Sequence, residues 1–106
     1  MKRHEQRKKA FQLLFQIDKS VVELKDTRFY EVYQTETFVK SVIDYYVHHQ
    51  DAVNEEISRF LTGYTIERIS KVERNILRLA VSELLSHGAP VKVVIDEAVK
   101  LAKKLR

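Results

Sequence analysis

An all-α fold is the class that this sequence predicts, and three observations support it. The 106 residues include only two glycines and one proline, so few positions interrupt a helix. Apolar side chains recur at the spacing that places them on one face of a helix. The chain shows little of the alternation between apolar and polar residues that is typical of strands.

Length and composition predict one domain over residues 1–106. Apolar residues make up 44% of the chain and charged residues 32%, which favours a folded core over disorder. The absence of cysteine excludes disulfides, thiolate catalysis and cysteine-bearing zinc sites, and it fits a reducing, cytoplasmic location. No apolar run has the length of a signal peptide or a membrane span, so we expect no membrane association.

The first helix is predicted from about Arg3 to Lys19. Its apolar face is formed by residues at helical spacing: Ala10, Phe11, Leu13, Leu14, Phe15 and Ile17. Basic side chains cluster ahead of this face, in the first two turns. Cations at a helix N-terminus oppose the helix dipole. A local rule broken in this way is typical of a functional segment.

For residues 20–36, the sequence predicts either a loop with one or two helical turns or a short helix that starts at Asp26-Thr27. A helix is expected over 37–48, and it should bury Phe38, Val42, Tyr45 and Tyr46. Another is expected from about Asp51, as N-cap, to Leu61, with Gly63 as its stop. The two segments also fit one bent helix.

The clearest helix start lies at Ser70. Ser70 and Glu73 fit a capping box, in which each side chain accepts a hydrogen bond from the backbone N–H of the other. The helix that follows is apolar over much of its circumference, which predicts a central position, and Gly88 ends it. Pro90 suits the start of a last helix. The side chains that this helix should bury are Val91, Val94, Ile95, Ala98, Ala102 and Leu105, with Lys92, Asp96, Lys100 and Lys103 on its outer face.

The charge distribution is uneven. Residues 1–20 carry a net charge of +4, residues 21–63 carry −4, and residues 64–106 carry +4. If the two basic ends meet in space, they form a patch that suits a polyanion. The alternative is a solvated surface whose charge is merely uneven.

The sequence resembles the NusB family of bacterial transcription antitermination factors. The matching segments are VERNILRLAVSEL at 72–84, AP at 89–90 and VVIDEAVKLAK at 93–103, and Ala10, Gln12, Leu14 and Phe15 follow the family's first-helix pattern. Family members usually continue into a further helix, whereas this sequence ends at Arg106. We therefore expect exposed apolar surface on the helices that this further helix would cover, a partner that covers that surface, or lower stability.

This resemblance implies a fold of two small three-helix bundles, either complete or without the last helix. It also implies a non-enzymatic, RNA-binding antitermination factor of rRNA transcription. Such factors pair with NusE, a small-subunit ribosomal protein, and together they recognise boxA-like RNA. Their complex includes other Nus factors and RNA polymerase. No cofactor is implied, and family members occur as monomers or homodimers.

The family's basic N-terminal segment contacts RNA. By resemblance, the expected RNA-binding residues are Lys2, Arg3, Arg7, Lys8, Lys9 and Gln12. Lysine and arginine neutralise phosphates, and base contacts on an unpaired strand supply sequence preference. The expected partner-binding residues are Glu73, Arg74 and Arg78. The alternative is that Glu73 only caps its helix and that the two arginines make surface contacts with acids.

Other functions find less support in the sequence. His48 and His49 are adjacent, so on a helix they diverge and cannot chelate one metal well. No nucleophile elbow and no glycine-rich phosphate loop occurs. Two alternatives remain: an accessory domain of an rRNA cytosine methyltransferase, and a helical DNA-binding or dimerisation module. The second is disfavoured because the 70–87 helix is too apolar to lie exposed in a groove of DNA.

Overall fold

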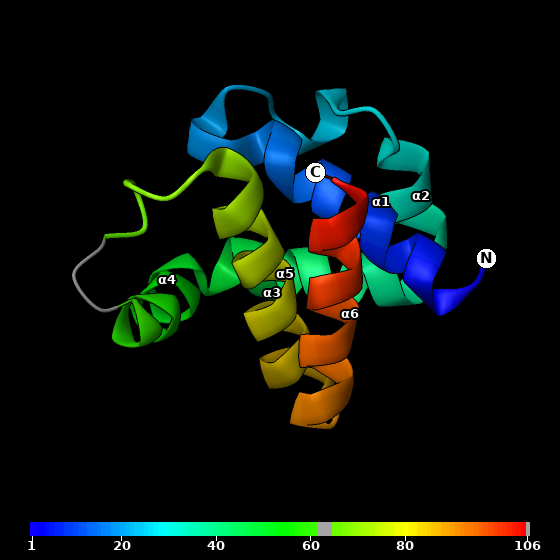
Figure 1. The fold of residues 1–106 in the computed structure, drawn as a ribbon. Helices are drawn as coiled ribbons and strands as arrows, with labels where there is room; N and C mark the ends of the chain where they lie inside the picture. Colours follow the sequence, from blue (N-terminus) through cyan, green and yellow to red (C-terminus); the bar gives the residue numbers. More distant parts are fainter. Residues whose placement is uncertain (62–64, 106) are drawn as a thin grey trace.

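The computed structural model describes residues 1–61 and 65–105, apart from the side chain of Phe60. These residues form six α-helices and no strand (Figure 1). The helices are α1 (Arg3–Ile17), α2 (Tyr30–Thr35), α3 (Thr37–His48), α4 (Gln50–Phe60), α5 (Lys71–His87) and α6 (Val91–Lys104). Two 3₁₀ turns, Asp18–Ser20 and Leu24–Asp26, connect α1 to α2. The all-α prediction is confirmed.

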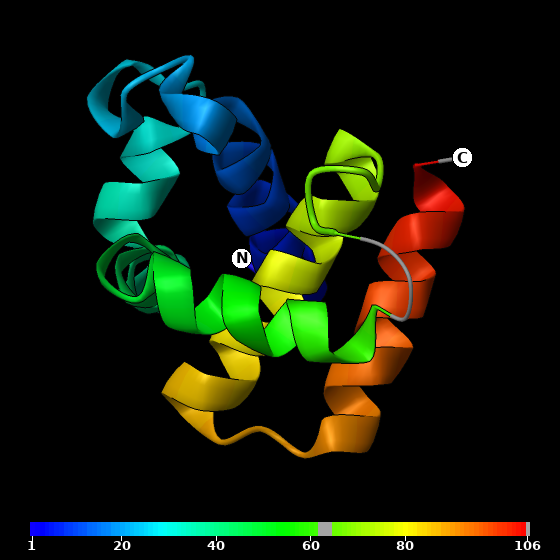
Figure 2. The ribbon, with the colours of Figure 1, turned by 90° about the vertical axis from the view of Figure 1, so that its left-hand side faces the viewer.

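Helix α5 is the central element of the fold. It packs against α1, α3, α4 and α6, while α2 packs mainly against α3. Figure 1 shows α3 passing behind α5 and α6 beside it, and Figure 2 shows α4 passing across α5. Helices α1 to α3 pack against one another as one three-helix group, and in the second group α4 and α6 each pack against α5. The central position predicted for the 70–87 segment is confirmed.

The core lies where α1, α3 and α5 meet. Its α1 side is built by Ala10, Leu13 and Leu14, which are almost fully buried, as their helical spacing predicted. On α3, Phe38, Val39, Val42, Ile43 and Tyr46 are buried. Tyr45, which was also expected in the core, is only half-buried. The apolar pattern of these two helices therefore identified most of the core.

The ends of α5 follow the predicted signals. The Ser70 hydroxyl accepts a hydrogen bond of 3.0 Å from the backbone N–H of Glu73, which is one half of the capping box. Gly88 ends the helix with a φ of 60°, the left-handed conformation that glycine adopts without strain. Both signals act through the local backbone, so no tertiary contact is needed to place these boundaries.

The boundary between α3 and α4 differs from the prediction. The helical backbone conformation is interrupted at His49, so α3 and α4 are separate helices and not one bent helix. Helix α4 starts at Gln50, which places Asp51 inside its first turn, and the N-cap role expected for Asp51 was wrong. Its carboxylate still lies where the helix dipole favours a negative charge. Gly63, the expected stop of this segment, lies outside the described residues.

The segment that was hardest to predict, 20–36, contains the second 3₁₀ turn and then α2. Phe29 precedes α2 with a φ of 72°, in the left-handed region that bulky residues rarely adopt. Gln16 on α1 holds this turn through two bonds to the Arg28 backbone. It accepts from the N–H at 2.7 Å and donates to the carbonyl at 3.1 Å.

The buried face of α5 is far more polar than its sequence suggested. The many apolar side chains of this segment predicted that α5 buries a mainly apolar surface. Leu85, one of these side chains, is instead 49% exposed. The buried positions of α5 include Arg74, Asn75, Arg78, Ser82 and Glu83 alongside Ile76 and Leu79. Four of these residues have charged partners outside α5: Asp18 meets Arg74, Asn75 and Arg78, and Arg7 meets Glu83. The buried Ser82 hydroxyl makes no hydrogen bond within the described residues.

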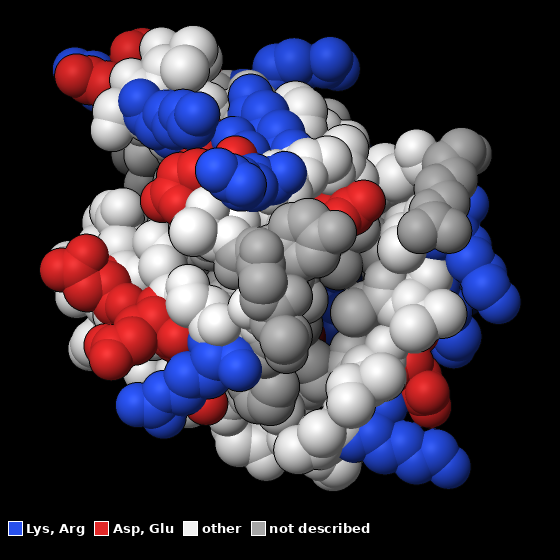
Figure 3. All heavy atoms as spheres, turned by 60° about the vertical axis from the view of Figure 1, so that its left-hand side comes forward, with Lys and Arg blue, Asp and Glu red and all other residues white. Residues whose placement is uncertain are grey.

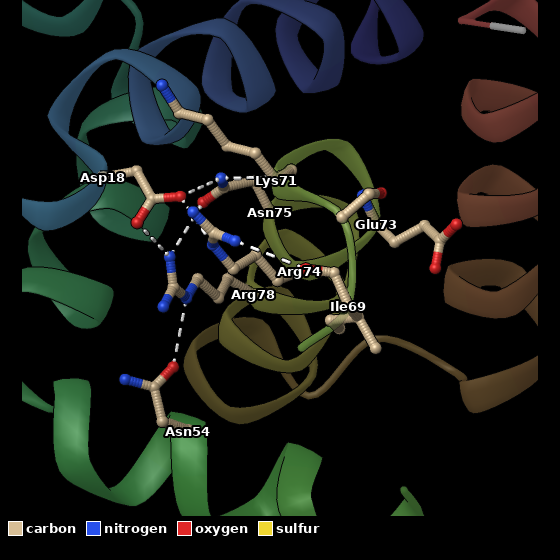
Figure 4. A network of polar contacts seen from close by, with 9 residues as sticks. Asp18, Asn54, Ile69, Lys71, Glu73, Arg74, Asn75 and Arg78 are labelled. Carbon is tan, nitrogen blue, oxygen red and sulfur yellow. Dashed lines mark hydrogen bonds and ion pairs between the residues drawn. The ribbon is translucent and has the colours of Figure 1, made fainter. Parts of the chain in front are cut away.

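The largest of these polar contacts centres on Asp18, which follows α1 and has a side chain only 1% exposed (Figure 4). Its carboxylate accepts hydrogen bonds from Arg74 Nε at 2.7 Å, Asn75 Nδ2 at 2.9 Å and Arg78 Nη1 at 3.1 Å. Arg78 Nε also donates to Asn54 Oδ1 of α4 at 3.1 Å. One carboxylate therefore connects α1 to α5 and, through Arg78, to α4.

This environment lowers the pKa of the Asp18 carboxyl. Burial opposes its ionisation, but hydrogen bonds from Asn75 and the two arginines outweigh that effect. Because the folded pKa lies below the unfolded value of about 3.9, the stabilisation is fully present above that value. It is lost as the pH falls through the folded pKa.

Helix α6 is less buried than predicted. Val94 and Leu101 face α5, and Ala98 and Ala102 are half-buried. The expected burial of Val91, Ile95 and Leu105 was wrong, because all three are exposed. The apolar side chains exposed on α5 and α6 are Leu85, Val91, Val93, Ile95, Val99 and Leu105. Since α6 packs mainly against α5, only one face of it is covered, and the exposed apolar surface expected on the last helices is confirmed.

None of the helices in the described ranges 1–61 and 65–105 is long and apolar enough to cross a membrane.

Replacing Asp18 with Asn should lower the free energy of unfolding by about 3–5 kcal/mol, because two buried guanidinium groups lose their counter-charge. Chemical denaturation monitored by circular dichroism measures this loss. Asp96→Asn, at an exposed position of α6, is the matched control and should change stability by less than about 0.5 kcal/mol. Equal effects of the two substitutions would contradict the role assigned to Asp18.

Candidate nucleic-acid interface

The two basic ends of the chain meet in space. The first turns of α1 and the last turns of α6 border a groove of about 380 Å³. Its lining residues are His4, Arg7, Lys8, Glu97, Lys100, Leu101, Lys103 and Lys104. The sequence left open whether positive charge from both ends gathers in one place. In the folded chain it does.

A second hollow of about 330 Å³ continues this groove along α1. It is lined by Lys8, Phe11, Gln12, Leu101, Lys104 and Leu105, three of which also line the first. We call the two together the α1/α6 groove. It combines a basic rim with apolar and amide side chains, a combination that suits a polyanion carrying flat, partly apolar groups.

Four lysines, Lys8 of α1 and Lys100, Lys103 and Lys104 of α6, give the groove its positive charge. All four are exposed. Glu97 is the nearest acid and lies 3.6 Å from Lys100 Nζ. Lys103 and Lys104 lie in the last turn of α6, where the helix dipole favours positive charge.

Arg7 lies at the floor of the groove but is held by the protein itself. Its Nε and Nη2 each donate a 2.8 Å hydrogen bond to the carboxylate of Glu83 on α5, and its Nη1 lies 3.6 Å from Glu97. The hydrogen bonds to Glu83 raise the pKa of Arg7 above its ordinary value. With its side chain 13% exposed, Arg7 supports the groove instead of offering a free cation.

Two other predicted RNA-binding cations lie over aromatic rings. The Arg3 guanidinium is 4.0 Å from the centre of the Phe38 ring, and Lys9 Nζ is 3.7 Å from that of Phe29. Lys2 and Arg3 are exposed at the start of α1, and Lys9 is half-buried. Of the six predicted RNA-binding residues, the groove thus brings together three: Arg7, Lys8 and Gln12.

The three residues expected to bind a partner separate in the structure. Glu73 is exposed in the first turn of α5. Arg74 and Arg78 are 7% and 8% exposed and bind Asp18. The alternative expected these arginines to contact acids at the surface. They do contact an acid, but the contact is buried. Neither arginine therefore presents its charge as part of a docking surface.

Sequence reasoning missed several important residues. Asp18 and Glu83 are the buried acids that neutralise arginines, and nothing in the local sequence distinguishes them from surface acids. Lys100 and Lys103 were recognised only as the outer face of the last helix. The basic run near the C-terminus, considered together with the basic N-terminus, was the signal that could have identified the α6 side of the groove.

Acidic side chains gather elsewhere. On the face shown in Figure 3, a cluster of acids lies on the left with a basic side chain below it, and Lys and Arg outnumber the acids along the upper and right edges. Helix α4 contributes Asp51, Glu55 and Glu56 to the acidic character of the middle of the chain. Within residues 1–61 and 65–105, no three His, Asp or Glu side chains come close enough to hold a metal ion.

Comparison with known proteins identifies a family. Residues 4–106 match the NusB family. The transcription antitermination protein NusB of Oceanobacillus iheyensis is 39% identical over 105 residues, which cover 96% of this chain and 83% of that protein. The protein of the same name from Bacillus subtilis is 37% identical over 107 residues, which cover 98% and 82%. These names describe transcription factors, in agreement with the expectation of a non-enzymatic protein.

A solved structure shares the fold. A chain in the structure described as "Crystal Structure of a Plectonemic RNA Supercoil" aligns with a TM-score of 0.72 and 31% identity. The alignment covers 98% of this chain and 83% of that one.

The structural role of Arg7 can be measured by a double-mutant cycle with Arg7→Met and Glu83→Gln. Unfolding free energies should show a coupling of about 1.5–3 kcal/mol, as for hydrogen bonds between charged groups. A matched cycle of Lys8→Met with Glu83→Gln should show almost no coupling, because no hydrogen bond or ion pair joins Lys8 to Glu83 in the described residues. Independent effects of Arg7 and Glu83 would mean that the pair does not hold α1 to α5.

Proposed function

This chain belongs to the NusB family, and from that premise we propose that it acts in transcription antitermination by binding single-stranded RNA in the α1/α6 groove. The observation that carries the proposal is the meeting of the two basic ends of the chain in one groove. Four exposed lysines there can neutralise phosphates and release the counterions that surround RNA.

The groove also offers contacts beyond phosphate. Gln12 is exposed on α1 and can donate to and accept from the edge of an unpaired base. Phe15, one turn further along α1 and beyond the residues that line the groove, is half-buried, and Lys71 Nζ lies 4.1 Å from its ring centre. A single strand that follows α1 from Lys8 would pass these side chains in order. Double-stranded RNA would hide the base edges that such contacts require.

The RNA and the partners are assigned by family resemblance. We propose that the RNA is a boxA-like element in nascent rRNA and that NusE, the small ribosomal protein, binds alongside it. Other Nus factors and RNA polymerase complete the assembly. Of the three residues expected at the NusE contact, Glu73 is the one that a partner can reach, because Arg74 and Arg78 are buried. The curated relatives are antitermination proteins, which favours this function over an accessory domain of a methyltransferase.

A homodimer also stays a prediction. The apolar side chains exposed on α5 and α6 support it, since surfaces of that kind are often covered by another molecule.

Replacing Lys8, Lys100 and Lys104 together with Ala should weaken binding of a boxA-like single-stranded RNA. Each phosphate contact contributes about 0.7 to the slope of log affinity against log salt on a single strand, so the slope should fall by about 2. Fluorescence anisotropy at several salt concentrations measures both quantities.

The matched control replaces three exposed cations outside the groove, Arg59, Arg68 and Lys92, and changes net charge equally. It should leave most of the affinity and slope intact. If the control weakens binding as much as the groove variant, attraction is due to net charge and the proposed site is wrong.

Glu73→Lys should slow association with NusE, because a charge at the rim of an interface acts mainly on the rate of encounter. Surface plasmon resonance measures the rate. The Ser70 cap should persist, since it uses the backbone N–H of residue 73. Glu55→Lys on α4 makes the same charge change at another exposed position and should have little effect. An unchanged rate for Glu73→Lys would remove this residue from the docking surface.

A further inference from the structure

A second polar pocket lies at the opposite end of α1 from the α1/α6 groove. It has a volume of about 200 Å³ and is bordered by the 3₁₀ turn after α1, by α4 and by the first turns of α5. The polar residues that line it are Asp18, Lys19, Ser20, Tyr46, Gln50, Asn54, Glu67, Arg74 and Arg78. None of the residues assigned to RNA or partner binding, apart from the two buried arginines, lines this pocket.

The buried charges beside this pocket do not balance. Arg74 and Arg78 have side chains 9% and 10% exposed, and both pair with the single carboxylate of Asp18. Glu67 also lines the pocket, but it is exposed, and within the described residues no ion pair joins it to either arginine. Two buried positive charges therefore share one buried negative charge. An uncompensated buried charge is costly, which favours an additional anion.

The two guanidinium groups retain donors for such an anion. Arg74 uses Nε on Asp18 and Nη1 on the carbonyl of Ile69. Arg78 uses Nε on Asn54 and Nη1 on Asp18 and Asn75. In the described part of the chain, the Nη2 of each arginine makes no hydrogen bond, and both side chains border the pocket (Figure 4).

Other groups around the pocket suit the same ligand. Lys19 adds a cation from the turn after α1, and the side chains of Gln50 and Asn54 add amide groups from α4. The guanidinium fork matches the oxygen atoms of a phosphate, and donors from several elements can surround a tetrahedral anion. A pocket of about 200 Å³ has room for a phosphate group.

We propose that this pocket is an oxyanion site that takes a phosphate group, either free phosphate or a phosphate of a bound nucleic acid. The anion lies against Arg74 and Arg78 and neutralises the charge that Asp18 leaves uncompensated. Binding here is independent of the α1/α6 groove, so the site can exist whether or not that groove binds RNA.

The test is an NMR titration of the whole chain with sodium phosphate, at an ionic strength held constant with sodium chloride. The backbone amides of Lys19 and Ser20 and the side-chain amides of Gln50 and Asn54 should shift and saturate. Sodium chloride alone should not reproduce these shifts. Shifts that do not saturate, or that appear only around Lys8 and the lysines of α6, would overturn the proposal.

Asn54→Asp is the decisive variant. It places a carboxylate where Arg78 Nε already donates, 3.1 Å away, and so supplies the missing negative charge without a change in shape. Phosphate binding should be lost, while the thermal midpoint in phosphate-free buffer stays equal or rises. Gln34→Glu, an equal charge change at an exposed position of α2, should keep phosphate binding. Saturable binding that survives in Asn54→Asp would contradict the proposal.

A competition experiment distinguishes the two sources of phosphate. If the boxA-like RNA shifts the same four amides and prevents their response to inorganic phosphate, the anion is a phosphate of the RNA. If these amides still respond to inorganic phosphate when RNA is bound, the site takes the free ion.

Discussion

The buried carboxylate of Asp18 is the constraint on which the packing of this protein depends. Arg74 and Arg78 on the central helix α5 are buried against the carboxylate of Asp18, which offsets one of their two positive charges, and this contact holds the end of α1 against α5. Arg78 extends the contact to Asn54, so α4 is held by the same group. Three helices thus meet at one charged centre. Its hydrogen bonds are directional, so they define the relative positions of the helices more specifically than an apolar contact would.

A second buried pair, Arg7 with Glu83, holds α1 to α5 at the other end. With both ends fixed, α1 lies in a defined position along α5, and its first turns come to rest beside α6. The α1/α6 groove is a consequence of this packing. Glu83 of α5 is engaged with Arg7, and Glu97 of α6 is the acid that lines the groove, 3.6 Å from Lys100 Nζ.

The basic residues therefore divide into two classes that composition cannot separate. Arginines such as Arg7, Arg74 and Arg78 are buried or partly buried, and their planar forks bind acids of the protein. Lysines such as Lys8 and Lys104 stay exposed at the groove. Residue type does not make this division, because Arg3, Arg59 and Arg68 are exposed. It depends on whether a buried acid lies within reach of the guanidinium group.

The sequence by itself determined the all-α class, the main helices and their caps, and the family, because helical periodicity, Ser70 and Gly88 act locally. The tertiary structure decided which charges are buried. Asp18 is separated by 56 residues from Arg74, and Arg7 by 76 from Glu83, so no local pattern reveals either pair. It also decided that α6 leaves Val91 and Ile95 exposed, since an amphipathic pattern predicts a buried face but not the helix that covers it.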